Sequence, residues 1–133
     1  MAKTPKPTDA ELAILRVLWT RGPSTVRELH DTMAASRSVA YTTTLKTLQV
    51  MTEKGLTIRE DHRGQHIYRP RHAEEETQRR LVTDLLDRAF GGSTSKLVIQ
   101  ALNSRHASPE ELREIRRLLA APKTGAQKGK DHD

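Results

Sequence analysis

The sequence predicts a mainly α-helical fold with one small β-hairpin, followed by a C-terminal helical region. Three observations carry this prediction. Apolar residues recur at helical spacing along the chain, and alternation with a period of two is confined to residues 56–69. The charge also divides unevenly. Residues 1–73 hold 12 basic and 7 acidic residues, a net charge of +5, whereas residues 74–133 hold 11 and 10.

Two capping boxes mark the first two helices. Thr8 is followed by Glu11, and Thr25 by Glu28, and each such pair can satisfy two backbone N–H groups at a helix start. The dipeptide at 22–23, Gly-Pro, ends the first helix, and residues 34–37 form a turn after the second. The apolar residues at helical spacing are Leu12, Ile14, Leu15, Leu18 and Trp19 in the first helix, and Val26, Leu29 and Met33 in the second.

A third helix is expected from about Ser38 to Lys54, because Gly55 ends the pattern. Thr44, Leu48 and Met51 fall on one face of this helix at spacings of four and three. The opposite face combines hydroxyls, an amide and a single cation, and it lacks acidic residues. Its members are Thr42, Thr43, Lys46 and Gln49.

A β-hairpin follows this helix. Residues 56–60 and 65–69 alternate with a period of two, residues 61–64 read as a turn ending in glycine, and Pro70 terminates the second strand. The tip of this hairpin is basic. Three helices followed by a hairpin is the order of a winged helix-turn-helix domain.

The C-terminal half predicts three helices with apolar stripes: residues 74–90, Ser95 to about Arg105, and a last helix whose start carries Ser108, Pro109 and Glu111. Exposed stripes of this size drive association, and a twofold copy would close them. A monomeric bundle folded back on the first helix is the alternative. The predicted dimerisation residues are Leu81, Leu85, Leu86, Phe90, Leu97, Val98, Leu102, Leu112, Ile115 and Leu119.

These elements divide the chain into four segments. They are a disordered basic arm at 1–7, a winged-helix domain at 8–72, a helical dimerisation region at 73–121 and a disordered tail at 122–133.

Composition excludes several classes of protein. The 133 residues are 35% apolar and 3% aromatic, which is too lean for a large single core. The absence of cysteine excludes disulfides, thiol nucleophiles and thiolate metal sites. No apolar run reaches the ~20 residues of a membrane helix, and no signal peptide is present, so we expect a cytoplasmic protein without membrane insertion.

We expect no catalytic residues, metal or cofactor. Ser93 and Lys96 match an acylating-serine spacing, but Ser93 is better explained as a helix cap, and His62 and His66 lack a third metal ligand.

The basic half favours double-stranded DNA as a partner. A helix about 10–12 Å across fits a major groove about 12 Å wide, and the third helix offers donors without negative charge. An interaction adaptor that keeps the winged fold without reading DNA is the alternative. The candidate DNA-binding residues are Ser38, Tyr41, Thr42, Thr43, Lys46, Thr47 and Gln49 from the helix, and Arg63, Gly64 and His66 from the hairpin, with Arg59 and Arg69 nearby.

Several stretches resemble the penicillinase repressors of the BlaI/MecI/CopY type. They are residues 9–19, 25–29, 39–48, 53–56, 66–70, 85–93, 97–98 and 108–119, so the resemblance covers about residues 8–120. It implies a cytosolic homodimer that represses transcription. Each winged helix would read half of a palindromic operator, and the C-terminal helices would hold the dimer.

The resemblance also implies roles for particular residues. By position, Thr42, Thr43, Lys46 and Thr47 would read the operator, Tyr41 would lie near the DNA backbone, and Arg63, Gly64 and His66 would form the wing contacts. In better-known members a membrane sensor metalloprotease relieves repression by cutting an Asn-Phe bond. Residues 99–103 here contain no such bond, and no cysteines are present for copper sensing.

Overall fold

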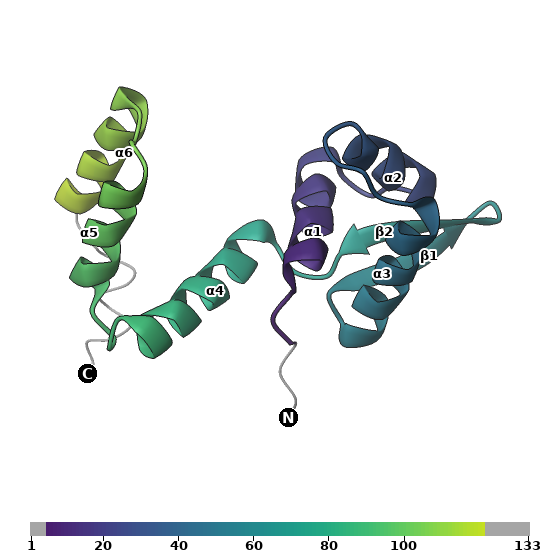
Figure 1. Ribbon diagram of the computed structural model, residues 1–133, viewed down its shortest axis with the longest axis horizontal. Coiled ribbons are helices and arrows are strands. Elements are labelled where there is room, and N and C mark those ends of the chain that lie inside the picture. Colours follow the sequence, from purple (N-terminus) through teal and green to yellow (C-terminus); the bar gives the residue numbers. More distant parts are fainter. Residues whose placement is uncertain (1–4, 122–133) are drawn as a thin grey trace. The chain divides into compact units, whose positions relative to one another are not determined.

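The computed structural model describes residues 5–121, and it confirms a mainly helical chain with a two-stranded antiparallel hairpin (Figure 1). The described chain divides into two compact units, and the boundary falls inside α4, after Leu85. Residues 1–4 of the predicted arm at 1–7, and the predicted tail at 122–133, lie outside the described residues. The elements are α1 (Asp9–Arg21), α2 (Val26–Ala34), α3 (Tyr41–Lys54), β1 (Thr57–His62), β2 (Gln65–Pro70), α4 (Glu74–Ala89), α5 (Thr94–Ser104) and α6 (Pro109–Ala120).

The core of the first unit is built from α1, α2, α3 and the hairpin. Leu29, Leu48 and Met51 are completely buried, and Leu18 is 1% exposed. Tyr68 of β2 is 2% exposed and belongs to the same cluster. Its place in the core was not predicted from the sequence. The core therefore closes within the helices and hairpin that form the winged helix-turn-helix.

The two predicted capping boxes are confirmed. The Thr8 hydroxyl accepts the Glu11 N–H at 3.2 Å, and the Glu11 carboxylate accepts the Thr8 N–H at 2.9 Å. Thr25 and Glu28 make the same two bonds at 3.1 and 2.9 Å. Both helix starts are thus fixed by local sequence alone.

The third helix begins later than predicted. Its first residue is Tyr41, and Ser38 lies in the preceding segment and is exposed. Val39 packs against the core, and Ala40 is extended, with its carbonyl accepting the N–H groups of Thr43 and Thr44 at 3.1 Å. The predicted start at Ser38 was wrong, because Ala40 takes the extended backbone of a helix cap and the partly buried Val39 before it packs on the core.

The hairpin turn is tighter than predicted. His62 pairs with Gln65, so the loop contains only Arg63 and Gly64 instead of four residues. Both have left-handed φ values, 55° and 83°, as a two-residue type I′ turn requires. Pro70 is the last residue of β2, so the second strand ends where the sequence predicted.

The second unit contains the end of α4, together with α5 and α6. The Ser93 hydroxyl accepts the Lys96 N–H at 3.1 Å, which confirms its role as a helix cap. Ser108 and Glu111 form a third capping box, with Pro109 at the first helical position. None of the helices within residues 5–121 has the length and apolar character that crossing a membrane requires.

Candidate nucleic-acid interface

The outer face of α3 is a polar surface. Thr44 is 2% exposed, and Leu48 and Met51 are fully buried, so this side of the helix packs on the core. The opposite side, formed by Thr42, Thr43, Lys46 and Gln49, is exposed. The helical period therefore places these four side chains where the sequence predicted. Within residues 5–121, Lys46 has no carboxylate partner for its ammonium group, so it can meet an external anion.

This face is free of acid only over its first turns. Glu53 is exposed on the same side, one turn after Gln49. It lies about 16 Å along the axis from Thr42. Thr47 is half-buried, and its hydroxyl donates to the Thr43 carbonyl at 2.8 Å. The positive and hydroxyl-rich surface is thus concentrated in the N-terminal part of α3.

The start of α3 is held against α2 by an aromatic contact. The Arg27 guanidinium lies 4.6 Å from the centre of the Tyr41 ring, and His30 meets the ring edge-on at 5.5 Å. The Nδ1 atom of His30 also lies 3.4 Å from the Thr44 hydroxyl. Sequence reasoning missed Arg27, because Tyr41 follows it by 14 positions and no local pattern links the two.

A hollow of about 240 Å³ lies between α2, α3 and the hairpin. It joins a guanidinium, a phenol, an amide and an imidazole on one concave surface, and its lining contains no carboxylate. Such donors can bind a phosphate group. The lining residues are Thr25, Val26, Arg27, Tyr41, Leu45, Gln65, His66 and Tyr68.

The hairpin cations are not equivalent. Arg69 pairs with Glu60 at 3.1 Å, and this hydrogen bond and charge lower the pKa of the Glu60 carboxyl. His66 lies 2.5 Å from the Asp61 carboxylate across the strands. Among the described residues, Arg59 and Arg63 have no acidic partner, and both are exposed. The positive charge available to a ligand therefore comes mainly from Arg59 and from Arg63 at the tip.

A buried ion pair fixes the C-terminal end of α3. Both carboxylate oxygens of Glu11 accept hydrogen bonds from the Lys54 ammonium, at 2.8 and 2.9 Å. Burial raises the pKa of Glu11, but the bonds from Lys54 and from the Thr8 N–H outweigh it, so the net pKa is lowered. The sequence identified Glu11 only as a cap and missed this link between α1 and α3.

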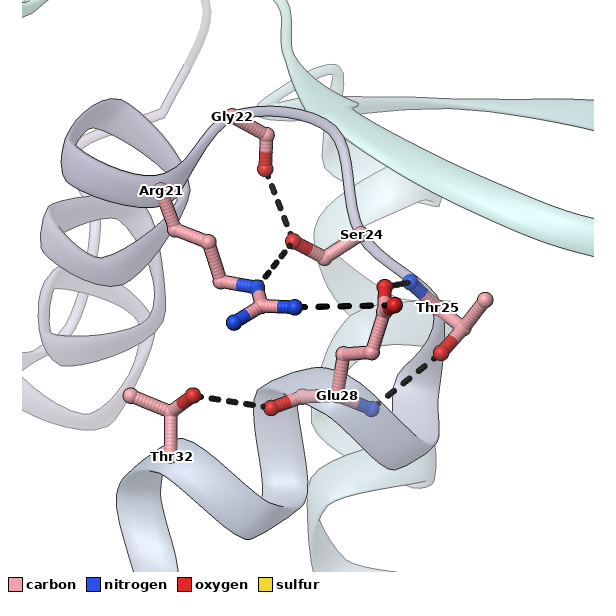
Figure 2. A network of polar contacts seen from close by, with 6 residues as sticks. All are labelled: Arg21, Gly22, Ser24, Thr25, Glu28 and Thr32. Atoms are coloured by element: carbon pink, nitrogen blue, oxygen red, sulfur yellow. Dashed lines mark hydrogen bonds and ion pairs between the residues drawn. The ribbon is translucent and has the colours of Figure 1, made fainter.

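A second polar network fixes the connection between α1 and α2, as Figure 2 shows. The buried Ser24 hydroxyl donates to the Gly22 carbonyl at 2.7 Å and accepts from the Arg21 Nε at 3.1 Å. Arg21 also lies 3.5 Å from the Glu28 carboxylate. Ser24 in addition exchanges two backbone hydrogen bonds with Tyr68 of β2, so α2 is anchored to the hairpin.

The predicted dimerisation residues lie on helices whose apolar side chains remain accessible. Neither α5 nor α6 contains a buried residue in the described chain. Leu81, Leu86, Phe90, Leu97, Leu112 and Ile115 are half-buried, whereas Leu85, Val98, Leu102 and Leu119 are exposed, Leu119 by 72%. Ile99 and Leu118 are more than half exposed as well.

No cluster of three or more histidine, aspartate or glutamate side chains suited to a metal ion occurs within residues 5–121. The structure brings donors of α2, α3 and the hairpin together around the hollow described above.

Comparison with known proteins is consistent with this architecture. The sequence profile of the penicillinase repressor family matches residues 7–121. The transcriptional regulator BlaI of Mycobacterium tuberculosis, in strains CDC 1551 and H37Rv, is 32% identical over 126 residues. The match covers 94% of this chain and 91% of that protein. Both matches are with transcriptional regulators and not with enzymes.

Proposed function

Because the chain belongs to the penicillinase repressor family and is a transcriptional repressor, we propose that it acts as a homodimer on a palindromic DNA operator. Each winged helix reads one half-site, with α3 in the major groove and the hairpin against the DNA backbone. The observation that carries this proposal is the outer face of α3. Its exposed hydroxyls, amide and unpaired ammonium lie on the side of the helix away from the buried residues, as a reading helix requires.

Base recognition falls to the exposed residues near the start of α3. Lys46 can donate to guanine O6 and N7, and Gln49 can pair with adenine N6 and N7. Thr42 and Thr43 can donate to bases or accept from them. Ser38, Tyr41 and Thr47 flank this set, and they contact phosphates in the proposed complex.

The hollow between α2, α3 and the hairpin receives the sugar-phosphate backbone. The Arg27 guanidinium lies 4.6 Å from the centre of the Tyr41 ring and 3.8 Å from the Asp31 carboxylate, so it is positioned before DNA arrives, and a phosphate can replace its exposed acidic partner. Gln65 and His66 approach the same hollow from the hairpin. Arg63 and Gly64 form the tip, where the type I′ turn lets the backbone come close to a groove.

The exposed stripes of α4, α5 and α6 support the homodimer. Contiguous apolar surface of this kind marks an interaction site. A twofold axis through it would present two α3 helices one helical turn of DNA apart, about 34 Å. The winged-helix segment at 8–72 and the dimerisation region at 73–121 are the corresponding functional divisions of the chain.

A gel-shift titration of the full chain on its own upstream DNA, with random-sequence competitor, tests the proposal. We expect sequence-selective retardation that weakens steeply with salt. Lys46→Ala and Thr43→Ala should each weaken selective binding about tenfold or more and leave non-selective binding much less affected. Lys96→Ala, which removes an exposed lysine of α5, is the matched control and should bind as the parent does. Absence of selective retardation at every salt concentration contradicts the proposal.

The hairpin separates this proposal from a DNA-independent adaptor. Charge reversal of Arg59 and Arg63, the two hairpin arginines without an acidic partner among the described residues, to glutamate should abolish DNA binding in the repressor. An adaptor would keep its protein partner in spite of the same changes.

Relief of repression by a membrane sensor metalloprotease is the induction route that the family resemblance suggests. Residues 99–103 lie within α5 and read Ile-Gln-Ala-Leu-Asn, with no Asn-Phe bond to cut. If a sensor protease acts on this chain, it therefore cuts at another bond, which mass spectrometry of the products would identify.

A further inference from the structure

The outer face of α3 also presents one apolar side chain, Val50, which is 39% exposed. Of the large apolar side chains that are exposed in the described chain, Val50 alone precedes α4. It belongs neither to the core cluster nor to the partly buried side chains that pack against that cluster. Packing within the winged-helix domain therefore does not account for a valine at this position.

On its N-terminal side Val50 neighbours residues assigned to base recognition, and on its C-terminal side it neighbours the exposed Glu53. Val50 follows Lys46 by four positions and Thr43 by seven, so all three share one face of the helix. A single exposed valine on an ordinary surface requires no explanation. Here, however, it lies on the polar surface that enters the major groove in the proposed function, one helical turn beyond the unpaired ammonium of Lys46.

The major groove offers one common apolar group, the C5 methyl of thymine. Every other base edge there presents hydrogen-bond donors or acceptors, which an isopropyl group cannot satisfy and would desolvate. We propose that Val50 is a specificity-determining residue that contacts a thymine methyl, so that each half-site contains an A·T pair at that position. This inference rests on the proposed function, because it requires α3 in the major groove.

Two steps test the proposal with the full chain. Duplexes with 30 randomised base pairs are first selected by binding to the protein, which defines the preferred site. Each thymine of one half-site is then replaced by deoxyuridine, which removes only the methyl group. Affinities of the parent and of Val50→Ala for every duplex are measured by fluorescence anisotropy.

We expect one thymine at which deoxyuridine weakens parent binding about fourfold, the factor that ~0.8 kcal/mol for one buried methyl group gives. Val50→Ala should bind the unmodified site more weakly and show no further loss from deoxyuridine at that thymine. All other thymines should affect both proteins equally. Alanine favours the helix more than valine does, so the variant should remain folded. Its non-selective DNA binding, measured alongside, should equal that of the parent.

The possible failures are distinguishable. If no site is enriched from the randomised pool, the proposed function fails and this inference fails with it. If a site is enriched but deoxyuridine affects the parent and Val50→Ala equally at every thymine, α3 still reads DNA and only the role of Val50 is refuted.

Discussion

The Glu11–Lys54 ion pair is expected to determine how firmly α3 is held in place. Lys54→Met removes the ammonium group and keeps a long side chain with good helix propensity. The Glu11 side chain is 5% exposed, so its carboxylate then loses two hydrogen bonds and retains the one from the Thr8 N–H at 2.9 Å. In the variant, the nearly buried Glu11 carboxylate therefore keeps a single hydrogen-bond donor, the Thr8 N–H.

The size of the effect follows from this exposure. Loss of one partner from a fully buried pair costs about 3–5 kcal/mol. Because the Lys54 side chain is 26% exposed, we expect a smaller loss of unfolding free energy, about 2–3 kcal/mol at pH 7. Glu11→Gln should cost less, about 1–1.5 kcal/mol, since Lys54 can then turn to water. The double variant should cost less than the sum of the two changes.

Lowering the pH should reduce the difference in unfolding free energy between the parent and Lys54→Met. The pKa of Glu11 is lowered from its ordinary value of 4.5, so the unfolded chain binds the proton more readily than the folded one. The pair therefore stabilises the protein fully at neutral pH and ceases to do so as the pH falls through the lowered pKa. In Lys54→Met the hydrogen bonds and charge of Lys54 no longer lower the pKa of Glu11, so its carboxyl binds a proton at a higher pH than in the parent. The stability gap between parent and variant should therefore narrow between pH 7 and pH 3.

Urea unfolding followed by the fluorescence of Trp19 measures this gap, because Trp19 is the single tryptophan and lies in α1. A midpoint shift of about 1–3 M at pH 7 is expected from an m value near 1–2 kcal/mol/M. A gap below about 0.5 kcal/mol at pH 7, the range of ordinary surface substitutions, would refute the reasoning. If the difference in unfolding free energy is equally large at pH 3, the charge of Glu11 is not its cause.

Two further changes test the interface. Arg27→Ala should weaken DNA binding of all sequences alike and reduce the salt dependence by about one phosphate contact, measured as the slope of log K against log salt. An unchanged slope would remove Arg27 from the backbone contacts. Gly64→Ala should destabilise the hairpin by about 1–2 kcal/mol, because φ at this position is 83°, a left-handed conformation that alanine adopts at a cost. No neighbouring atom lies within 4 Å of an added Cβ, so a steric clash does not add to this cost. Hydrogen exchange of the backbone amides in β1 and β2 measures this loss of stability. Exchange rates equal to those of the parent would contradict the predicted backbone strain.

Local sequence rules predicted the elements that local chemistry determines. The starts of α1, α2 and α6 follow from a hydroxyl and a glutamate three residues apart, and all three capping boxes form. The helical period likewise separated the buried face of α3 from its polar face. The helix start at Tyr41 was missed, because the packing of Val39 on the core decides it, and no local pattern encodes that contact.

Contacts between residues distant in sequence could not be predicted. Glu11 and Lys54 are 43 positions apart, and nothing in either neighbourhood indicates that they meet. The same holds for the stacking of Arg27 on Tyr41. In the hairpin, the residues were correctly recognised as basic, but the pairing of Arg69 with Glu60 depends on cross-strand register. Which cations remain available to DNA is therefore a property of the fold.

The division of the chain into two units leads to a last prediction. Every buried residue of the hydrophobic core lies between Ile14 and Tyr68, inside the first unit. The second unit instead carries accessible apolar side chains on α5 and α6. A chain that ends at Leu85 should therefore fold and keep a cooperative urea transition of Trp19, but it should sediment as a monomer at concentrations where the full chain is a dimer.

Such a fragment separates DNA reading from dimerisation. It keeps the whole outer face of α3 and the hairpin, so its non-selective binding should persist. It loses the linkage between half-sites, and the second half-site then no longer binds at a high effective concentration, so affinity for a palindromic site should fall about 10²- to 10⁴-fold. If the fragment still dimerises and binds the palindrome as the full chain does, the subunit contacts lie in the first unit. If it fails to fold, the first unit depends on residues 86–121 in spite of its closed core.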